Sequence, residues 1–278
     1  MKLVADSGST KTHWMLMGEE GERHCVTVGL NPLFADREVF DSACRQVVSD
    51  LEIGEEVIRQ LFFYGAGCGT ESSCQRVRQW LQDALECEEI EIGSDLLGAC
   101  RATCGKEPGM VGIMGTGSNM CYYDGREIAR RRVSTGYILG DEGSGNHIGK
   151  RLLKDYLEER MPQGLRAMFH ADYPMEAAAF IDRLYRQPNP NRFLASLAAF
   201  ASRHKEDLYV QRVLSHCFEE FFEQTAFFGE HALLPLHLVG GLVTSFEPEM
   251  RRAASVKGVT LGTLTPSPVA GLAHYHGL

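Results

Sequence analysis

Asp6-Ser7-Gly8-Ser9-Thr10-Lys11-Thr12 lies between two apolar runs, Leu3–Ala5 and His13–Met17, near the start of the chain. Both runs have the length and the bounding turn residues typical of strands, so this stretch predicts a strand, a bend and a second strand. Small and hydroxylated residues in the bend let backbone N–H groups and Lys11 approach a phosphate. Asp6 would repel a phosphate but can hold Mg²⁺ through water. An ordinary Gly- and Ser-rich hairpin turn would have the same pattern. A P-loop is excluded because Thr10 stands where that motif has glycine, and because a strand follows.

A second bend of the same kind occurs later in the chain. Gly115-Thr116-Gly117-Ser118-Asn119 separates the apolar runs Gly109–Met114 and Met120–Tyr123. Asp124-Gly125 then predicts a hairpin turn, as Glu19–Glu22 does after the first pair of strands. Strand, bend, strand, hairpin and strand therefore occur twice, which indicates two halves built on one plan. A chance likeness between two Gly-rich hairpins is the alternative.

The rest of the chain alternates between helical and strand-like patterns. Between the two bends, the pattern predicts helices over residues 36–51, 73–85 and 94–104, and strands over 61–64 and 89–93. After the second bend it predicts helices over residues 144–160, 175–186, 190–203 and 206–229, a strand over 236–239, a helix after Glu247-Pro248, a strand near 259–261 and a C-terminal helix, Val269–Tyr275.

The composition is that of a soluble globular protein with one large or two ordinary domains: 278 residues, 44% hydrophobic and 23% charged. The formal net charge of −9 argues against nucleic acid or an anionic membrane as the main partner. Nine cysteines without a framework spacing predict thiols in a reducing cytoplasm. Cys100 and Cys104 can in principle share a metal, but buried small side chains explain them better. No signal-peptide pattern or long apolar run is present, so a cytoplasmic location is expected.

Five elements follow one another in a fixed order: Asp6–Thr12, Asp95, Gly115–Asn119, Gly140–Ser144 and Gly240-Gly241. This order resembles the superfamily of sugar kinases, actin and heat-shock chaperone ATPases, and more closely the N-acetylglucosamine kinases grouped with the BadF/BadG/BcrA/BcrD ATPases. The resemblance covers nearly the whole chain. It implies an α/β fold of two ribonuclease-H-like domains of the actin and sugar-kinase type, with ATP and Mg²⁺ in a cleft between them. The domains would be residues 1–105 and 106–265, with a C-terminal helix of about 266–278 on the first.

The resemblance also implies a role for each matching residue. Asp95 would be the general base, and Asp6 would orient Mg²⁺. The ATP phosphates would be bound by Gly8, Ser9, Thr10, Lys11, Thr12, Gly115, Thr116 and Gly117, and the adenosine side by Gly240 and Gly241. The sugar would be bound by Asn31, Ser118, Asn119, Gly136 and Asp141. From the residues alone, Asp95 also fits a helix N-terminal acid that offsets the helix dipole, and Asp141 also fits an ordinary turn carboxylate.

The activity that the resemblance implies is ATP-dependent phosphorylation of the 6-hydroxyl of an amino sugar by a homodimer, with N-acetylglucosamine as the first candidate. Here Thr135 stands where the family has an aromatic residue, so glucosamine and N-acetylmuramic acid remain open as acceptors.

Two alternatives belong to other functional classes. An iron–sulfur activator ATPase of the BadF type is disfavoured because the cysteines lack cluster spacing and Leu242-Val243 follows the glycine pair. A non-catalytic nucleotide-binding regulator is disfavoured because such a protein needs neither Asp95 nor Asp141.

Overall fold

The computed structural model describes residues 1–18, 21–54 and 57–277. Residues 19–20 of the predicted first hairpin turn and Leu278 at the end of the predicted C-terminal helix lie outside the described residues. The chain divides into two compact units. Unit 1 comprises Met1–Val111, Tyr123–Ala129 and Ser267–Leu278, and unit 2 comprises Gly112–Tyr122 and Arg130–Pro266. The domain ranges expected from the sequence stay a prediction.

Unit 1 contains a five-stranded mixed sheet with the strand order β3-β2-β1-β4-β5. The first three strands form an antiparallel meander, and β1, β4 and β5 run parallel. Because parallel strands end at the same edge of a sheet, the carboxyl ends of β1, β4 and β5 lie in a row. The strands are β1 (Lys2–Ser7), β2 (Lys11–Gly18), β3 (Gly21–Val28), β4 (Ile58–Gly65) and β5 (Cys87–Ser94).

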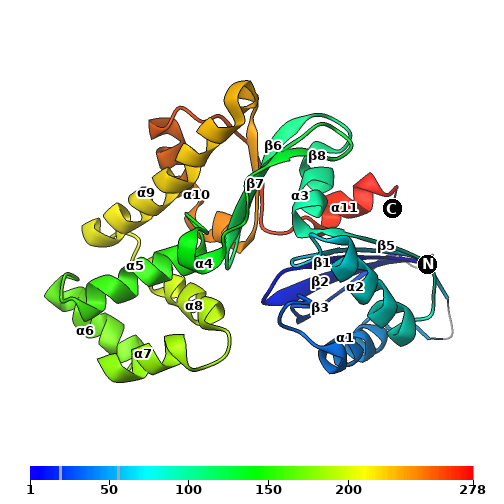
Figure 1. Cartoon of the computed structure of the whole chain (residues 1–278), viewed down its shortest axis with the longest axis horizontal. Coiled ribbons are helices and arrows are strands. Elements are labelled where there is room, and N and C mark those ends of the chain that lie inside the picture. The colour runs from blue at the N-terminus through cyan, green and yellow to red at the C-terminus, as the bar shows by residue number, and fades with distance from the viewer. Residues whose placement is uncertain (19–20, 55–56, 278) are drawn as a thin grey trace. The chain divides into compact units, whose positions relative to one another are not determined.

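Helices cover both faces of this sheet (Figure 1). Leu3 and Ala5 of β1 pack with buried residues of α1 (Arg37–Asp50) and α2 (Glu71–Ala84) on one face. Val4 packs on the other face with α11 (Val269–Tyr275), which lies beside α3 (Asp95–Cys104). Successive strand side chains alternate between faces, so Asp6 belongs to the α3 and α11 face and Ser7 to the opposite one.

The second sheet repeats the first, with the strand order β10-β9-β6-β7-β8. Each strand from β6 to β10 has the position in its sheet that the strand numbered five lower, from β1 to β5, has in the first sheet. This repeat confirms the expectation of two halves on one plan. The strands are β6 (Gly109–Met114), β7 (Ser118–Tyr123), β8 (Ile128–Arg131), β9 (Leu236–Val239) and β10 (Leu261–Thr265).

The helices of unit 2 are α4 (Gly136–Leu139), α5 (Gly145–Leu157), α6 (Gln163–Asp172), α7 (Ala177–Tyr185), α8 (Pro190–Arg203), α9 (Leu208–Glu223), the 3₁₀ segment η1 (Gln224–Leu233) and α10 (Gly241–Val256). The sequence did not predict α4 or α6. The helix predicted over 206–229 stops at Glu223 because the chain tightens into η1, and Gly229 has a φ of 62°. The strand predicted near 259–261 is β10, which begins only at Leu261. Among the described residues, no helix is long and apolar enough to cross a membrane.

Candidate active site

The hairpin between β1 and β2 is held rigidly from within unit 1. The Gly8 N–H donates to the Lys11 carbonyl at 2.9 Å and closes the turn. Ser7 Oγ lies 2.8 Å from Thr12 Oγ1 and accepts from the Leu30 N–H at 3.0 Å. Both residues are fully buried, so the Thr12 side chain stabilises the hairpin from the interior of unit 1. The turn therefore presents residues 8–11 at its tip, where small residues permit a close approach to phosphate.

Gly29, just after β3, packs against the backbone of the same turn. A Cβ atom at this position would lie 2.5 Å from the Gly8 carbonyl oxygen, so only glycine lets β3 and the turn approach this closely. The Gly29 N–H also donates to the Thr10 carbonyl at 3.0 Å. The backbone of the predicted phosphate-binding turn is thus set by its packing against the end of β3.

Two carboxylates lie at the carboxyl edge of the parallel strands of unit 1. Asp6 is the penultimate residue of β1, and Asp95 follows β5 and begins α3. The register Ser7, Gly65, Ser94 across β1, β4 and β5 puts both strand ends in one row. The Asp95 carboxylate accepts the Leu96 N–H at 2.8 Å, and Ser94 Oγ accepts the Leu97 N–H at 3.2 Å as the helix cap.

The pKa values of both carboxyls are raised. Burial, followed by the charge of Asp95, raises the pKa of Asp6 to about 7, and Lys11 partly offsets this. Burial raises the pKa of Asp95, against the hydrogen bond from the Leu96 N–H. A raised pKa makes a carboxylate a better proton acceptor near neutral pH, and two neighbouring carboxylates fit a bound cation. The structure therefore places Asp95, the predicted general base, close to Asp6, the residue predicted to orient Mg²⁺.

Asn31 connects the predicted sugar side to the predicted phosphate hairpin. Its side chain is 5% exposed, and its Nδ2 donates to Ser9 Oγ at 3.2 Å. Its Oδ1 accepts the Leu33 N–H at 3.0 Å. A Cβ atom on Gly67, in the turn after β4, would lie 2.2 Å from Asn31 Oδ1. The Asn31 side chain is therefore fixed in place beside the hairpin tip.

The second bend connects β6 to β7 and is hydrogen-bonded to the beginning of α5. The Gly115 N–H donates to the Gly117 carbonyl at 2.9 Å, as the turn of the first hairpin does across Gly8 and Lys11. The N–H groups of Gly145 and Asn146 donate to the Gly115 and Thr116 carbonyls at 2.9 and 3.1 Å. The bend and the start of α5 therefore form one hydrogen-bonded substructure.

Gly240, at the end of β9, packs on the end of β6, just before the second bend. It has a φ of 137°, and a Cβ atom there would lie 2.2 Å from the Met114 carbonyl oxygen. Gly241 begins α10, and a Cβ atom on it would meet no atom within 4 Å. The predicted adenosine-side pair and the predicted second phosphate loop are therefore neighbours in unit 2.

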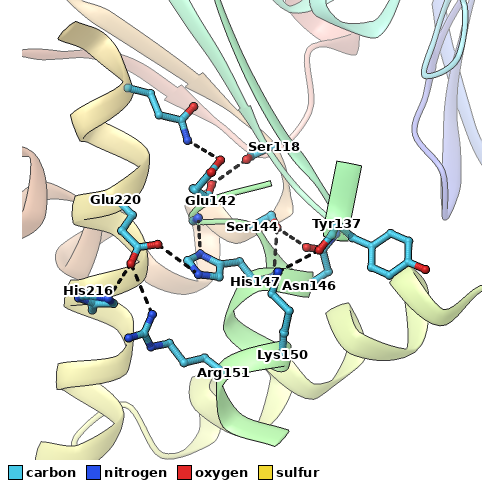
Figure 2. Close-up of polar contacts among 12 residues, drawn as sticks. Ser118, Tyr137, Glu142, Ser144, Asn146, His147, Lys150, Arg151, His216 and Glu220 are labelled. Atoms are coloured by element: carbon cyan, nitrogen blue, oxygen red, sulfur yellow. Dashed lines mark hydrogen bonds and ion pairs between the residues drawn. The ribbon is translucent and has the colours of Figure 1, made fainter. Parts of the chain in front are cut away.

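Asp141 is held by donors on two sides. It has a φ of 59°, a left-handed conformation that is uncommon for a residue with a side chain. Its Oδ1 accepts the Ser118 N–H at 3.3 Å, and its Oδ2 accepts Asn146 Nδ2 at 2.9 Å. The Ser118 hydroxyl donates to the Glu142 carbonyl at 2.7 Å, so Ser118 fixes the loop around Asp141 (Figure 2).

The two other predicted sugar residues of unit 2 have local backbone roles. Asn119 Oδ1 accepts the Met120 N–H at 2.8 Å. Gly136 has a φ of 68° and begins the short helix α4. The Tyr137 carbonyl in α4 accepts Lys150 Nζ of α5 at 2.9 Å, which ties this turn to the helix that carries Asn146 (Figure 2).

Sequence reasoning missed three polar residues of this region, which are Asn146, His147 and Glu220. Asn146 is 1% exposed and bonds both Asp141 and the Ser144 hydroxyl. A polar side chain two residues after the Gly-Asp-Glu-Gly-Ser run was the available signal for Asn146. His147 and Glu220 are far apart in the chain, and no sequence signal links them.

The cysteines form no metal site within the described part of the chain. No group of three or more His, Cys, Asp or Glu side chains there could hold a metal ion, and none of the nine cysteines is in a disulfide in the described residues. Burial raises the pKa of Cys44 and Cys217 to about 12, so these thiols are inert.

Comparisons with known proteins agree with this geometry. Over residues 5–223 the chain matches the model of the BadF/BadG/BcrA/BcrD ATPase family. A crystal structure from Porphyromonas gingivalis, described as a "putative N-acetylglucosamine kinase", is 38% identical, with a TM-score of 0.93 over 99% of this chain and 98% of that one. A protein of the same description from Chromobacterium violaceum is 18% identical, with a TM-score of 0.75 over 99% of each chain, and shows the shared fold.

A curated relative matches part of the chain. The N-acetylmuramic acid/N-acetylglucosamine kinase of Clostridium acetobutylicum is 30% identical over 125 residues, which is 42% of this chain and 40% of the relative. The two mixed five-stranded sheets with their helices are the actin and sugar-kinase fold, as expected. With a family model that matches most of its length, the chain belongs to the BadF/BadG/BcrA/BcrD ATPase family.

Proposed function

We propose that this protein is an ATP-dependent kinase that phosphorylates the 6-hydroxyl of an amino sugar, with N-acetylglucosamine as the first candidate. The observation that carries the proposal is the grouping in unit 1 of a phosphate-type hairpin, two carboxylates of raised pKa and Asn31, which is bonded to the hairpin. The 38% identity to the Porphyromonas gingivalis protein supports the substrate class.

Phosphoryl transfer requires mainly positioning and charge neutralisation. In the proposed reaction, the hairpin tip and Lys11 bind the ATP phosphates, together with Gly115–Gly117 of unit 2. Gly240 and Gly241 would lie on the adenosine side, near the second bend, and Gly241 leaves open space there. Mg²⁺ bound near Asp6 would supply positive charge to the phosphates, and the neighbouring carboxylates of Asp6 and Asp95 fit such an ion.

Asp95 accepts the proton of the attacking hydroxyl in this proposal. Its raised pKa brings its basicity closer to neutral pH, where a general base is most effective. Asn31 and Asp141, each held by hydrogen bonds, would bind and orient the sugar hydroxyls or the acyl group.

The proposal is tested by ADP release over N-acetylglucosamine, N-acetylmuramic acid, N-acetylmannosamine, glucosamine and glucose, with and without Mg²⁺. We expect sugar-dependent ADP release with an amino sugar, a phosphorylated product identified by ³¹P NMR as the 6-phosphate, and none with 6-deoxy-N-acetylglucosamine. ATP binding without any sugar-dependent ADP release would instead support a nucleotide-binding regulator. A brown protein that loses its colour in oxygen would support an iron–sulfur activator.

A further inference from the structure

The loop that carries Asp141 is tied to α9 by two side-chain contacts that have no part in the proposed chemistry. Gln224 Nε2, just after α9, donates to the Glu142 carboxylate at 2.7 Å. His147 of α5 lies between the loop and Glu220 of α9 (Figure 2). Both contacts act on residues that directly follow Asp141 in the chain.

The contacts of His147 fix its tautomer. Its Nδ1 accepts the Gly143 N–H at 3.0 Å, so Nδ1 carries no proton. The proton of the neutral ring is therefore on Nε2, which faces Glu220 Oε2 at 3.4 Å. His147 is 7% exposed, and burial lowers its pKa to about 4 although Glu220 raises it. The ring thus accepts from the loop on one side and donates to α9 on the other.

Glu220 is itself held by basic groups of two helices. His216 Nε2 of α9 lies 2.6 Å from Glu220 Oε1, and Arg151 Nη1 of α5 lies 3.5 Å from the same atom. Lys150 of α5 and these two residues are the basic groups that face His147, and all three lower its pKa. Glu220 therefore has a fixed position from which to accept the Nε2–H of His147.

Gly143 is fixed on its other side by packing. It has a φ of 75°, and a Cβ atom there would lie 2.7 Å from Phe221 Cβ of α9. The Gly143 peptide is therefore held between His147 and α9. Asp141, two residues earlier, has a left-handed backbone, which is uncommon for a residue with a side chain and persists where surrounding contacts enforce it.

We propose that His147 and Glu220 form a positioning pair that fixes the Gly143 peptide and so holds Asp141 in the conformation that binds the acceptor sugar. This inference rests on the sugar-kinase function proposed above. His147 contacts the Gly143 N–H on one side and Glu220 on the other, so the pair acts on Asp141 through the loop.

Three substitutions of His147 separate its two hydrogen bonds. His147→Asn keeps an acceptor near the Nδ1 position, His147→Gln keeps a donor near the Nε2 position, and His147→Leu keeps neither. We expect the sugar KM of His147→Asn to stay within about 3-fold of wild type, and that of His147→Gln and His147→Leu to rise about 10-fold, since each loses the acceptor of the Gly143 N–H. The KM for ATP should stay within about 2-fold in all three.

The α9 side is tested with a matched pair of substitutions. Glu220→Gln removes the charge beside His147 and should raise the sugar KM about 2–5-fold. Glu223→Gln, which lies three residues later on α9 and is bonded to Lys257, should leave both KM values unchanged. Equal changes in the KM for sugar and for ATP, or a sugar KM that follows thermal stability across the five variants, would overturn the proposal in favour of a purely structural role.

The tautomer of His147 gives a readout that needs no activity. Long-range ¹H–¹⁵N NMR of the histidine side chains, assigned with His147→Gln, should show the Nε2–H form from pH 8 to pH 5.5. An Nδ1–H form overturns the positioning pair even in an active kinase. If wild type shows the expected tautomer but no sugar-dependent ADP release, the proposed function fails, and the sugar role of the pair fails with it.

Discussion

Asp6 and Asp95 of unit 1 and Asp141 of unit 2 are carboxylates at equivalent ends of two repeated sheets, but their surroundings differ. Burial raises the pKa of both Asp6 and Asp95, and the charge of Asp95 raises the pKa of Asp6 further. Asp141 is held by a backbone donor and by the amide of Asn146. A crowded pair of carboxylates suits proton and cation chemistry, whereas a carboxylate with fixed donors suits the orientation of a neutral ligand. The same repeated plan thus supports two different tasks.

The largest effect is expected from Asp95→Asn. An amide cannot accept the proton of the attacking hydroxyl, so kcat should fall about 10²–10⁴-fold, with both KM values within a few-fold of wild type. Steady-state ADP release measures this. Asp83→Asn, which removes an acid of the same unit that is ion-paired to Arg37, is the control and should keep wild-type turnover. If Asp95→Asn keeps more than about a tenth of the wild-type kcat, Asp95 is a helix N-terminal acid and not a base.

A smaller effect, confined to the sugar, is expected from Asp141→Asn. The loss of a charged acceptor should raise the sugar KM about 10–100-fold and leave the KM for ATP nearly unchanged. Asp124→Asn is the matched control, because Asp124 is a turn carboxylate that accepts two backbone N–H groups at 2.8 Å but belongs to an exposed hairpin. A parallel rise of the KM for ATP would contradict the separate tasks of the two carboxylate sites.

Two glycines test the same separation through the backbone. A Cβ atom on Gly29 would press on Gly8 at 2.5 Å, and a Cβ atom on Gly117 would press on the Asp141 carboxylate at 2.9 Å. Gly29→Ala should therefore raise the KM for ATP about 10-fold and leave the sugar KM nearly unchanged. Gly117→Ala should raise both KM values, because Gly117 belongs to the proposed second phosphate bend and its Cβ would press on Asp141. Gly164→Ala is the control, since its Cβ would meet no atom within 4 Å. The comparison fails if the two variants change both KM values alike.

Local patterns predicted those parts of this arrangement that depend on neighbours in the chain. The C-terminal helix has the predicted bounds, Val269–Tyr275, and both strand–bend–strand elements form as expected. The helix α6 was missed because Gly164 in its first turn weakens the helical pattern, although Leu165 and Phe169 have the spacing of one buried face.

Contacts between distant residues could not be predicted. Asp6 and Asp95 are neighbours only because β1, β4 and β5 pair in register, which is a property of the folded sheet. His147 and Glu220 are in contact because α5 packs on α9. In the sequence, neither residue alone differs from an ordinary polar residue of a helix. Asp141 was proposed as a sugar residue from family resemblance, but its left-handed backbone and its bond to Asn146 appear only in the structure.

The smallest effect is a pH-dependent gain of stability in Asp6→Asn. The pKa of Asp6 is about 7 in the folded protein and near 4 in an unfolded chain, so the folded state binds the extra proton between these values. Proton binding by Asp6 stabilises the folded protein, and this stabilisation is lost as pH rises toward and through 7. His147 and His276, whose pKa values are lowered to about 4, act with the opposite sign, because their contribution grows as pH rises from about 4 to about 6.5. These histidines are present in both wild type and Asp6→Asn, so their contributions cancel in the difference between the two proteins.

Urea unfolding at pH 6 and pH 8 measures this difference, and the free energy of unfolding of Asp6→Asn should rise relative to that of wild type by about 1 kcal/mol between the two pH values. The same gain should shrink in an Asp95→Asn background, since the charge of Asp95 contributes to the raised pKa of Asp6. A difference that stays constant between the two pH values would mean that Asp6 titrates normally, and the contrast between the two carboxylate sites would lose its electrostatic basis.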